Sequence, residues 1–143
     1  MVPKAIVAQT KPGKRLRRES YLALGMVESL LKKIFLISAD VRYVAIYVRG
    51  KLTSSERPGL ENASSSQSDK FEELIVNPTL LKLITQRGNI DCGGAEFVII
   101  RYGSFYEFVM PFIDGHVSVG IQLNADPMTI AKSIQNLAKE YSS

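Results

Sequence analysis

The segment from residue 97 to residue 123 constrains the fold most, because it contains three short apolar runs joined by two tight turns. The first two runs, Phe97–Tyr102 and Phe105–Phe112, are separated only by Gly103-Ser104. In the third run, His116–Leu123, apolar residues alternate with polar or small ones. Strict alternation places one set of side chains on each face of a sheet, and short turns join antiparallel neighbours. We therefore predict an antiparallel meander with one face on the core and the other polar or in contact with another surface.

The sequence also predicts the elements on both sides of this meander. Apolar residues at helical spacing predict a heavily buried helix from about Glu19 to Ile37. A β-branched and aromatic run, Val41–Val48, turns tightly and returns as a more polar strand from Leu52 to about Arg57, which predicts a hairpin. Near the end of the chain, Asp126 is a good helix cap and Pro127 suits the first helical position, so a helix should run to Tyr141.

The region between the hairpin and the meander predicts an interrupted helix. A serine-rich loop leads into it, with Ser68 or Asp69 placed to cap the helix. Its first apolar residues fall at helical spacing and are Phe71, Leu74 and Ile75. Pro78 disfavours a helical residue before it, so we expect a kink or break there and a second segment over residues 80–87. Gly88 would then cap its C-terminus.

These elements follow one another in the order α-β-β-α-β-β-β-α, which defines the expected fold class. The natural packing is an α/β (α+β) domain in which helices flank a single five-stranded antiparallel sheet. With 143 residues, 45% of them hydrophobic, the chain suits one globular domain. No apolar run approaches the roughly 18 residues of a membrane span, and a single cysteine forms no internal disulfide. We therefore expect a soluble, cytoplasmic protein without a transmembrane segment.

Positive charge is concentrated at the N-terminus. Residues 1–18 contain six basic side chains and no acidic one, so residues 19–143 carry 12 basic and 14 acidic groups, a net charge of −2. We predict a basic, flexible tail over residues 1–18 and the folded domain over 19–143. The tail residues that an anionic partner would meet are Lys11, Lys14, Arg15, Arg17 and Arg18. Two interpretations stay open: a solvated tail, or an electrostatic arm for nucleic acid or an anionic membrane surface.

Residues that carry catalytic or metal chemistry are scarce. The chain has no glycine-rich phosphate loop, and one histidine with one cysteine cannot complete a closed zinc site. Cys92 and His116 are candidates for a nucleophile and its base, but a small apolar residue and a polar surface residue are their commoner roles. The carboxylates near turns, Glu96, Glu107 and Asp114, fit a solvated role better than an acid–base pair. We therefore predict no enzymatic activity, no catalytic residue, no metal site and no cofactor.

The C-terminal half resembles a known family. The run Phe108-Val-Met-Pro-Phe-Ile-Asp-Gly-His-Val-Ser-Val119 is similar to a strand, glycine turn and strand of the roadblock/dynein light chain family, whose members are small profilin-like domains. A short link and a final helix follow, as in that family. The likeness spans about residues 20–141 and rests on apolar and turn patterns. The chain is also similar to a group of uncharacterised archaeal proteins.

The resemblance implies a strand order of 2-1-5-4-3, with the first and last helices on one face and the middle helix on the other. Family members dimerise by pairing their third strands and middle helices. The matching positions here are Leu80, Leu81, Ile84, Phe97, Ile99 and Arg101. An unpaired strand this apolar would also be an aggregation risk, which favours pairing. The implied function is a non-catalytic scaffold or regulator of small Ras-like GTPases, dimeric with itself or with a paralogue.

Two alternatives to a scaffold stay open: a nucleic-acid or membrane-surface adaptor that uses the basic tail, and a small-ligand sensor on the related profilin-like architecture. The sensor would require an apolar cavity between the sheet and the middle helix. Such a cavity would be lined by Tyr43, Tyr47 and Phe105.

Overall fold

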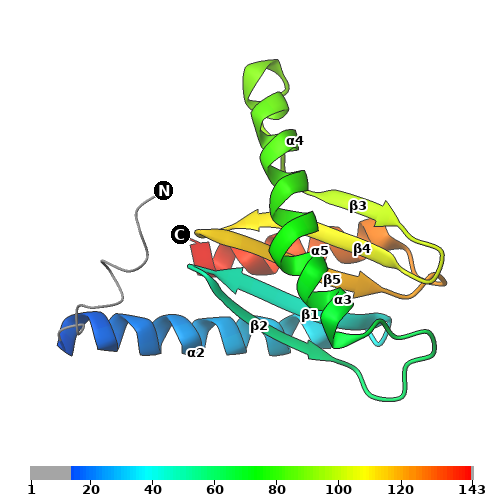
Figure 1. Cartoon of the computed structure of the whole chain (residues 1–143), viewed down its shortest axis with the longest axis horizontal. Coiled ribbons are helices and arrows are strands. Elements are labelled where there is room, and N and C mark those ends of the chain that lie inside the picture. The colour runs from blue at the N-terminus through cyan, green and yellow to red at the C-terminus, as the bar shows by residue number, and fades with distance from the viewer. Residues whose placement is uncertain (1–13, 143) are drawn as a thin grey trace.

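The computed structural model of the chain describes the backbone of residues 14–142 and the side chains of residues 23–141. With the labels of Figure 1, the elements are α2 (Lys14–Ile37), β1 (Val41–Val48), β2 (Lys51–Glu56), α3 (Ser66–Phe71), the π-helical turn η1 (Glu72–Val76), α4 (Asn77–Asp91), β3 (Val98–Arg101), β4 (Tyr106–Phe112), β5 (Gly115–Ile121) and α5 (Pro127–Ser142). The predicted fold class is confirmed. No helix of this described part is both long and apolar enough to cross a bilayer.

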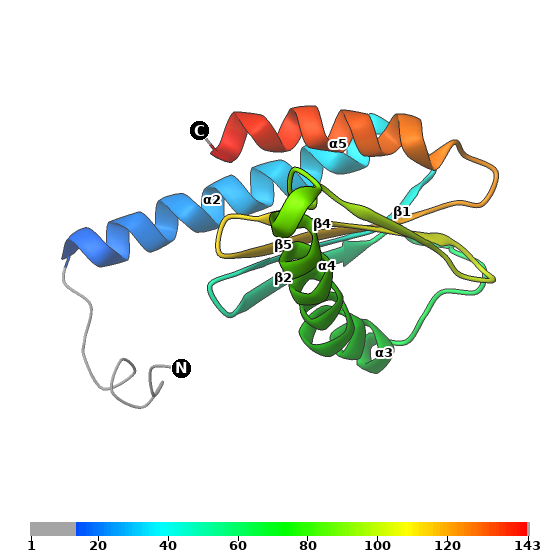
Figure 2. The same ribbon diagram turned by 90° about the horizontal axis from the view of Figure 1, so that it is seen from above.

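One antiparallel sheet organises the molecule, with its strands in the order β2-β1-β5-β4-β3. Figure 2 shows α2 and α5 together on one face and the continuous helical segment α3–η1–α4 on the other. Both the strand order and this division of the helices agree with what the family resemblance implies. The last turns of α4 extend past β3, the strand at one edge of the sheet (Figure 1).

The hydrophobic core lies between the sheet and the α2–α5 layer. Alternate residues of the three central strands point into it, including Val44, Phe108 and Val119, all 0% exposed. Ile34 of α2 and Ile134 of α5 meet them from the helical side and are also 0% exposed. This face is built as the alternation predicts, because successive strand residues point to opposite sides of the sheet.

The first helix begins earlier than the sequence pattern indicates. Helix α2 starts at Lys14 rather than near Glu19, so residues 14–18 of the predicted tail have a helical backbone. Their side chains and all of Lys11 lie outside what the structure describes. The electrostatic role of this tail stays a prediction.

Of the kink or break predicted at Pro78, the break is wrong, because the middle helical segment is continuous from Ser66 to Asp91. Proline lacks an N–H and its ring would clash with the carbonyl group four residues earlier. Here the turn before Pro78 is widened: Asn77 donates its backbone N–H to Glu72, five residues back. A π-helical turn of this kind gives the proline room without ending the helix. The helix cap is Ser65, whose side chain accepts from the backbone N–H of Ser68, rather than Ser68 or Asp69.

Gly88 has a different role from the predicted C-terminal cap. It is a buried residue inside α4, which continues to Asp91. A Cβ atom at this position would lie 2.8 Å from the backbone nitrogen of Ala95 and 3.0 Å from the carbonyl carbon of Gly94. The backbone N–H groups of Cys92 and Gly94 both donate to the Gly88 carbonyl. The glycine therefore lets the chain leaving α4 fold back closely over the helix.

Candidate functional site

The middle helical segment faces the sheet with polar residues, which the sequence pattern did not indicate. Its first buried side chains are Glu73 and Asn77, both 0% exposed and four residues apart on one helical face. The apolar residues that fall at helical spacing in the sequence are exposed instead. Their exposed fractions are 60% for Phe71, 45% for Leu74 and 54% for Ile75.

Glu73 is the centre of a buried hydrogen-bond cluster beneath this helix. Its Oε1 atom accepts from Asn77 Nδ2 and from His116 Nε2, each at 2.9 Å. Its Oε2 atom accepts from Ser118 Oγ at 2.9 Å. His116 and Ser118 lie two residues apart on the face of β5 that the middle helix covers. They are 1% and 0% exposed. The bonds from His116 and Ser118 join the helix to the sheet, and the bond from Asn77 orients the carboxylate from within the helix.

Glu107 of β4 joins this cluster through Ser118, whose Oγ atom lies between the two glutamates. A serine hydroxyl has one proton and can donate it to only one of them. One carboxyl group must therefore carry a proton of its own. Burial and the nearby Glu73 charge raise the pKa of Glu107 well above its ordinary value, so Glu107 is the protonated member and donates to Ser118.

Two expectations for single residues are therefore wrong. His116 does not occupy an exposed surface position, and Glu107, 3% exposed, is not solvated. Both residues belong to the second face of the sheet, which α3–η1–α4 covers. Asp114 and Glu96 are at the surface as expected: Arg49 Nε donates to Asp114 at 2.9 Å, and Gln135 Nε2 donates to Glu96 at 3.1 Å.

The protonated Glu107 should make stability fall as the pH rises. Between the pKa of the unfolded chain, near 4.5, and the higher folded value, the native state holds a proton that the unfolded state releases. Each pH unit in this window lowers the free energy of unfolding by up to about 1.4 kcal/mol. Glu107→Gln keeps an N–H donor for Ser118 and does not titrate, so it should flatten this slope. Urea unfolding from about pH 5 to pH 8 measures it.

The matched control is Glu96→Gln, which removes an exposed carboxyl group outside the cluster. It should unfold with the slope of the wild type. Parallel curves for wild type and Glu107→Gln would contradict the assigned proton.

The candidate pair of Cys92 and His116 is not brought together. The Cys92 thiol is exposed at the end of α4 and contacts Asp91. His116 is buried, bonded to Glu73, and lies with its ring centroid 5.6 Å from that of Tyr47. Among the side chains of residues 23–141, no group of three His, Cys, Asp or Glu residues is arranged to hold a metal ion.

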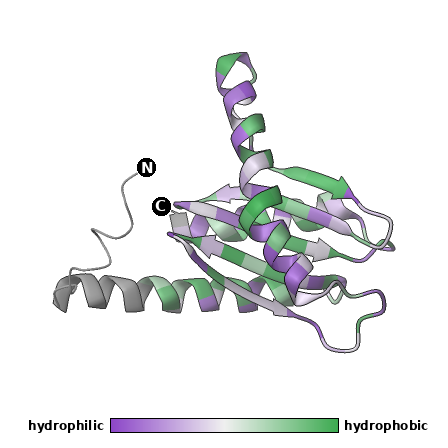
Figure 3. Ribbon diagram, viewed as in Figure 1, coloured by the Kyte–Doolittle hydropathy of each residue, from purple (hydrophilic) through white to green (hydrophobic). Residues whose placement is uncertain are grey.

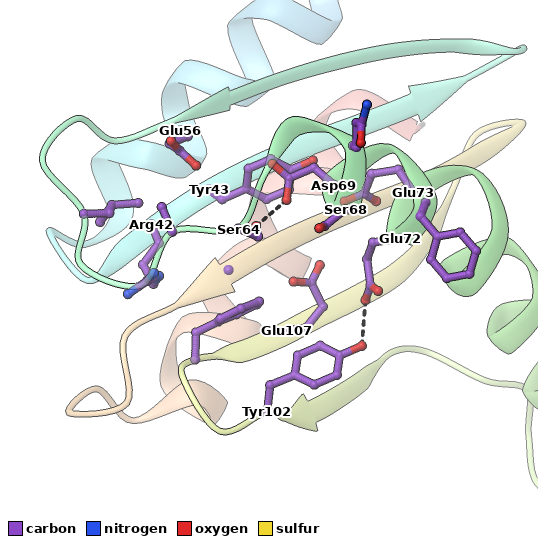
Figure 4. Close-up of a pocket in the computed structure, with 16 residues that line it drawn as sticks. Arg42, Tyr43, Glu56, Ser64, Ser68, Asp69, Glu72, Glu73, Tyr102 and Glu107 are labelled. Carbon is purple, nitrogen blue, oxygen red and sulfur yellow. Dashed lines mark hydrogen bonds between the residues drawn. The ribbon is translucent and has the colours of Figure 1, made fainter.

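A cavity of about 540 Å³ opens beside the buried cluster, between the sheet and α3–η1. Figure 4 shows side chains from both layers that line it. Of the three residues expected around such a cavity, Tyr43 and Phe105 line it and Tyr47 does not. The walls are also more polar than expected, because Arg42 and several carboxylates belong to them.

The open edge of the sheet is the second candidate site. Tyr102 donates its backbone N–H to Phe105 across the β3–β4 turn. Because inward and outward backbone groups alternate along an antiparallel strand, Ile99 and Arg101 direct their N–H and C=O groups to the open side of β3. These two residues are among the predicted interface positions.

The other predicted interface side chains are partly or fully buried within the single chain. Leu81 is buried at 8% exposure, and Leu80 and Ile84 are half-buried. Phe97 packs on Phe108 with ring centroids 5.4 Å apart. The apolar side chains that α4 does expose are Leu83, at 60%, and Ile90, at 76%. Figure 3 shows apolar residues along both α4 and β3.

Solved structures with this arrangement include the Roadblock/LC7 domain from Streptomyces avermitilis, with a TM-score of 0.58 at 17% identity over 78% of this chain and 90% of that chain. The fold is therefore the roadblock fold that the C-terminal sequence pattern indicates. MglB in a tetrameric arrangement has a TM-score of 0.56 at 9% identity over 81% and 90%. The gliding protein MglB from Thermus thermophilus has 0.52 at 11% over 78% and 87%. No protein-family model and no curated protein sequence matches this chain.

Proposed function

We propose that this protein is a non-catalytic dimeric scaffold or regulator that acts with a small Ras-like GTPase. The proposal rests on one observation: the open edge strand β3 is apolar, and the helix α4 beside it exposes apolar side chains. Both features expose surface that a second copy of the chain would bury.

The two edges of the sheet differ in a way that favours β3 as the pairing edge. Strand β2 is largely exposed and reads Lys-Leu-Thr-Ser-Ser-Glu, and such polar, charged edges resist pairing with another chain. Strand β3 reads Val-Ile-Ile-Arg. Two antiparallel β3 strands would continue the sheet across the dimer, with the overhanging turns of α4 beside the junction (Figure 1).

The buried polar cluster supports the same interface. It holds the inner face of the middle helix with Glu73 and Asn77, which leaves the apolar residues for the outer face. Exposed apolar side chains concentrated on one element mark an interaction surface. The GTPase part of the proposal rests on the likeness to the roadblock family.

Solution mass by light scattering tests the dimer, with Leu83→Glu as the main variant. A charge at this 60%-exposed position on α4 should weaken dimerisation by about tenfold or more while the fold persists. The control is Leu36→Glu, at an 83%-exposed leucine on α2 across the sheet, which should leave the mass unchanged. A wild-type monomer at tens of micromolar, or equal effects of the two variants, would refute the proposed interface.

Strand pairing is tested separately at Arg101, which is exposed at the end of β3. Arg101→Pro removes a backbone N–H that faces the open edge and keeps the β3–β4 ladder. Arg101→Ala removes the same side chain and keeps the N–H. The proline variant alone should lose the dimer. The GTPase part is tested by binding of purified small Ras-like GTPases from the same genome, loaded with GDP or a GTP analogue, to wild type and to Leu83→Glu.

A further inference from the structure

We propose that the cavity between the sheet and α3–η1 binds a small organic cation. Its ammonium or guanidinium group would lie among the cavity carboxylates and its carbon skeleton against the aromatic walls. This activity goes beyond the scaffold function and does not depend on dimerisation.

The cavity has the size and the mixed walls of a small-molecule site. Its volume of about 540 Å³ lies within the range of about 300–1,000 Å³ that is usual for ligand pockets. The apolar part of its lining is mostly aromatic and consists of Tyr43, Leu60, Ala63, Phe71, Tyr102 and Phe105. Aromatic faces attract organic cations through the ring quadrupole.

The charges around the cavity are not balanced within the protein. The carboxyl groups in its lining are Glu56, Asp69, Glu72, Glu73 and Glu107. Glu107 carries a proton and adds no charge. Among the side chains of residues 23–141, Glu73 alone of the other four lies within ion-pair distance of a basic group, His116. The cavity's one cation within that range, Arg42, gives its hydrogen bonds to neutral oxygens, those of Gln122, Glu61 and Asn62. In Figure 4 its guanidinium group is turned away from the carboxylates.

The pKa values of titratable groups in the lining are shifted in the direction that an excess of negative charge produces. Burial raises the pKa of Glu72 and of Glu107, and the charge of Glu73 adds to both rises. Burial together with nearby carboxylates also raises the pKa of Tyr43 and of Tyr102 above their usual range. A ligand that brings positive charge would relieve this repulsion.

A buried hydroxyl group in the lining also lacks a partner. The oxygen of Tyr43 is buried and has no partner at ordinary hydrogen-bond geometry within the described part of the chain, although it lies close to the Glu73 carboxylate. Buried polar groups without a partner are rare in native proteins, and a bound ligand is one way to satisfy them. Opposite it, Glu72 accepts from the Tyr102 hydroxyl at 2.9 Å, which orients its carboxylate toward the space that Glu107 also faces (Figure 4).

An organic cation fits these walls better than a metal ion. The carboxylates are spread over several elements, and no three metal-ligating side chains of residues 23–141 converge on one point. The spread suits a ligand that carries more than one N–H donor. The aromatic walls suit the carbon atoms between its donors.

The test is calorimetric titration of the full chain with 1,4-diaminobutane, 4-guanidinobutylamine and benzylamine. Controls are 1,4-butanediol, a neutral analogue of the first, and Mg²⁺. We expect saturable binding of at least one cation, at least about tenfold tighter than the diol. No saturable binding of any cation up to about 10 mM, or equal binding of the diol, would overturn the proposal.

Three variants locate the site. Glu72→Gln should weaken binding of the cation by about tenfold, because a charged hydrogen-bond acceptor is lost. Glu28→Gln, on the exposed surface of α2 across the sheet, should bind as the wild type does. Tyr43→Phe should leave the free protein as stable as the wild type or more so, and should still weaken binding. Unchanged affinity in both Glu72→Gln and Tyr43→Phe would place any binding elsewhere and overturn the assignment.

Discussion

Glu73→Ala is expected to lower the free energy of unfolding by about 3–5 kcal/mol, the usual cost of removing one partner from a buried charged cluster. The reason is what remains after the change. The donors of His116, Ser118 and Asn77 would stay buried beneath the helix without their common acceptor. Urea unfolding at neutral pH, with an unchanged dependence on urea as evidence for the same folded state, measures the loss.

Two companions make this result specific. Glu73→Gln keeps one acceptor oxygen and should cost less than Glu73→Ala. Glu96→Ala removes an exposed carboxylate and should change stability by less than about 0.5 kcal/mol. A loss below about 1 kcal/mol for Glu73→Ala would mean that the cluster does not hold the middle helix in place.

The meander and hairpin were predictable because the sequence carries their signals locally. Val41–Val48 has the predicted bounds, and the other strands differ from prediction by a few residues at their ends. Pro127 begins α5, and Asp126 accepts from the Met128 N–H and the Thr129 hydroxyl, as a cap should. Alternation, turn residues and caps depend on neighbours in the chain, so one sequence suffices to read them.

The candidate site was not predictable in the same way, because its members are polar residues that meet only in three dimensions. Glu73 reaches partners on β5 that are 43 and 45 positions away. A polar pair four residues apart, Glu73 and Asn77, was the available signal. It was outweighed by Phe71, Leu74 and Ile75, whose spacing is typical of a core stripe. Local periodicity identifies a helix but cannot tell which of two contrasting faces meets the sheet.

The inverted polarity of this helix links the two candidate sites. Its inner face forms hydrogen bonds with His116 and Ser118 of β5, and Ser118 in turn is bonded to Glu107 of β4. Its outer face then carries the apolar residues proposed to meet a second chain, and its N-terminal end forms a wall of the cavity. Any change that rotates the helix should therefore affect stability, association and ligand binding together.

Gly115 lets the backbones of β1 and β5 approach closely beneath this helix. It begins β5 opposite Val48 of β1, immediately before His116. A Cβ atom at Gly115 would lie 2.6 Å from the carbonyl carbon of Tyr47 and nearer still to its oxygen, so no side-chain adjustment would relieve the clash. The backbone of β1 or β5 would have to move, and the hydrogen-bond donors of His116 and Ser118 lie on β5.

Gly115→Ala is therefore expected to cost about 3 kcal/mol or more, at or beyond the upper end of overpacking effects, because the obstacle is backbone. The control is Gly103→Ala in the β3–β4 turn, where a Cβ atom meets nothing within 4 Å. It should be nearly neutral, within about 0.5 kcal/mol. Urea unfolding of both variants, with the His116 ring signals in NMR as a local probe, makes the comparison. If Gly115→Ala loses stability while the His116 signals stay in place, the strand moves without disturbing the cluster, and the cluster is held by the helix rather than by the register of β5.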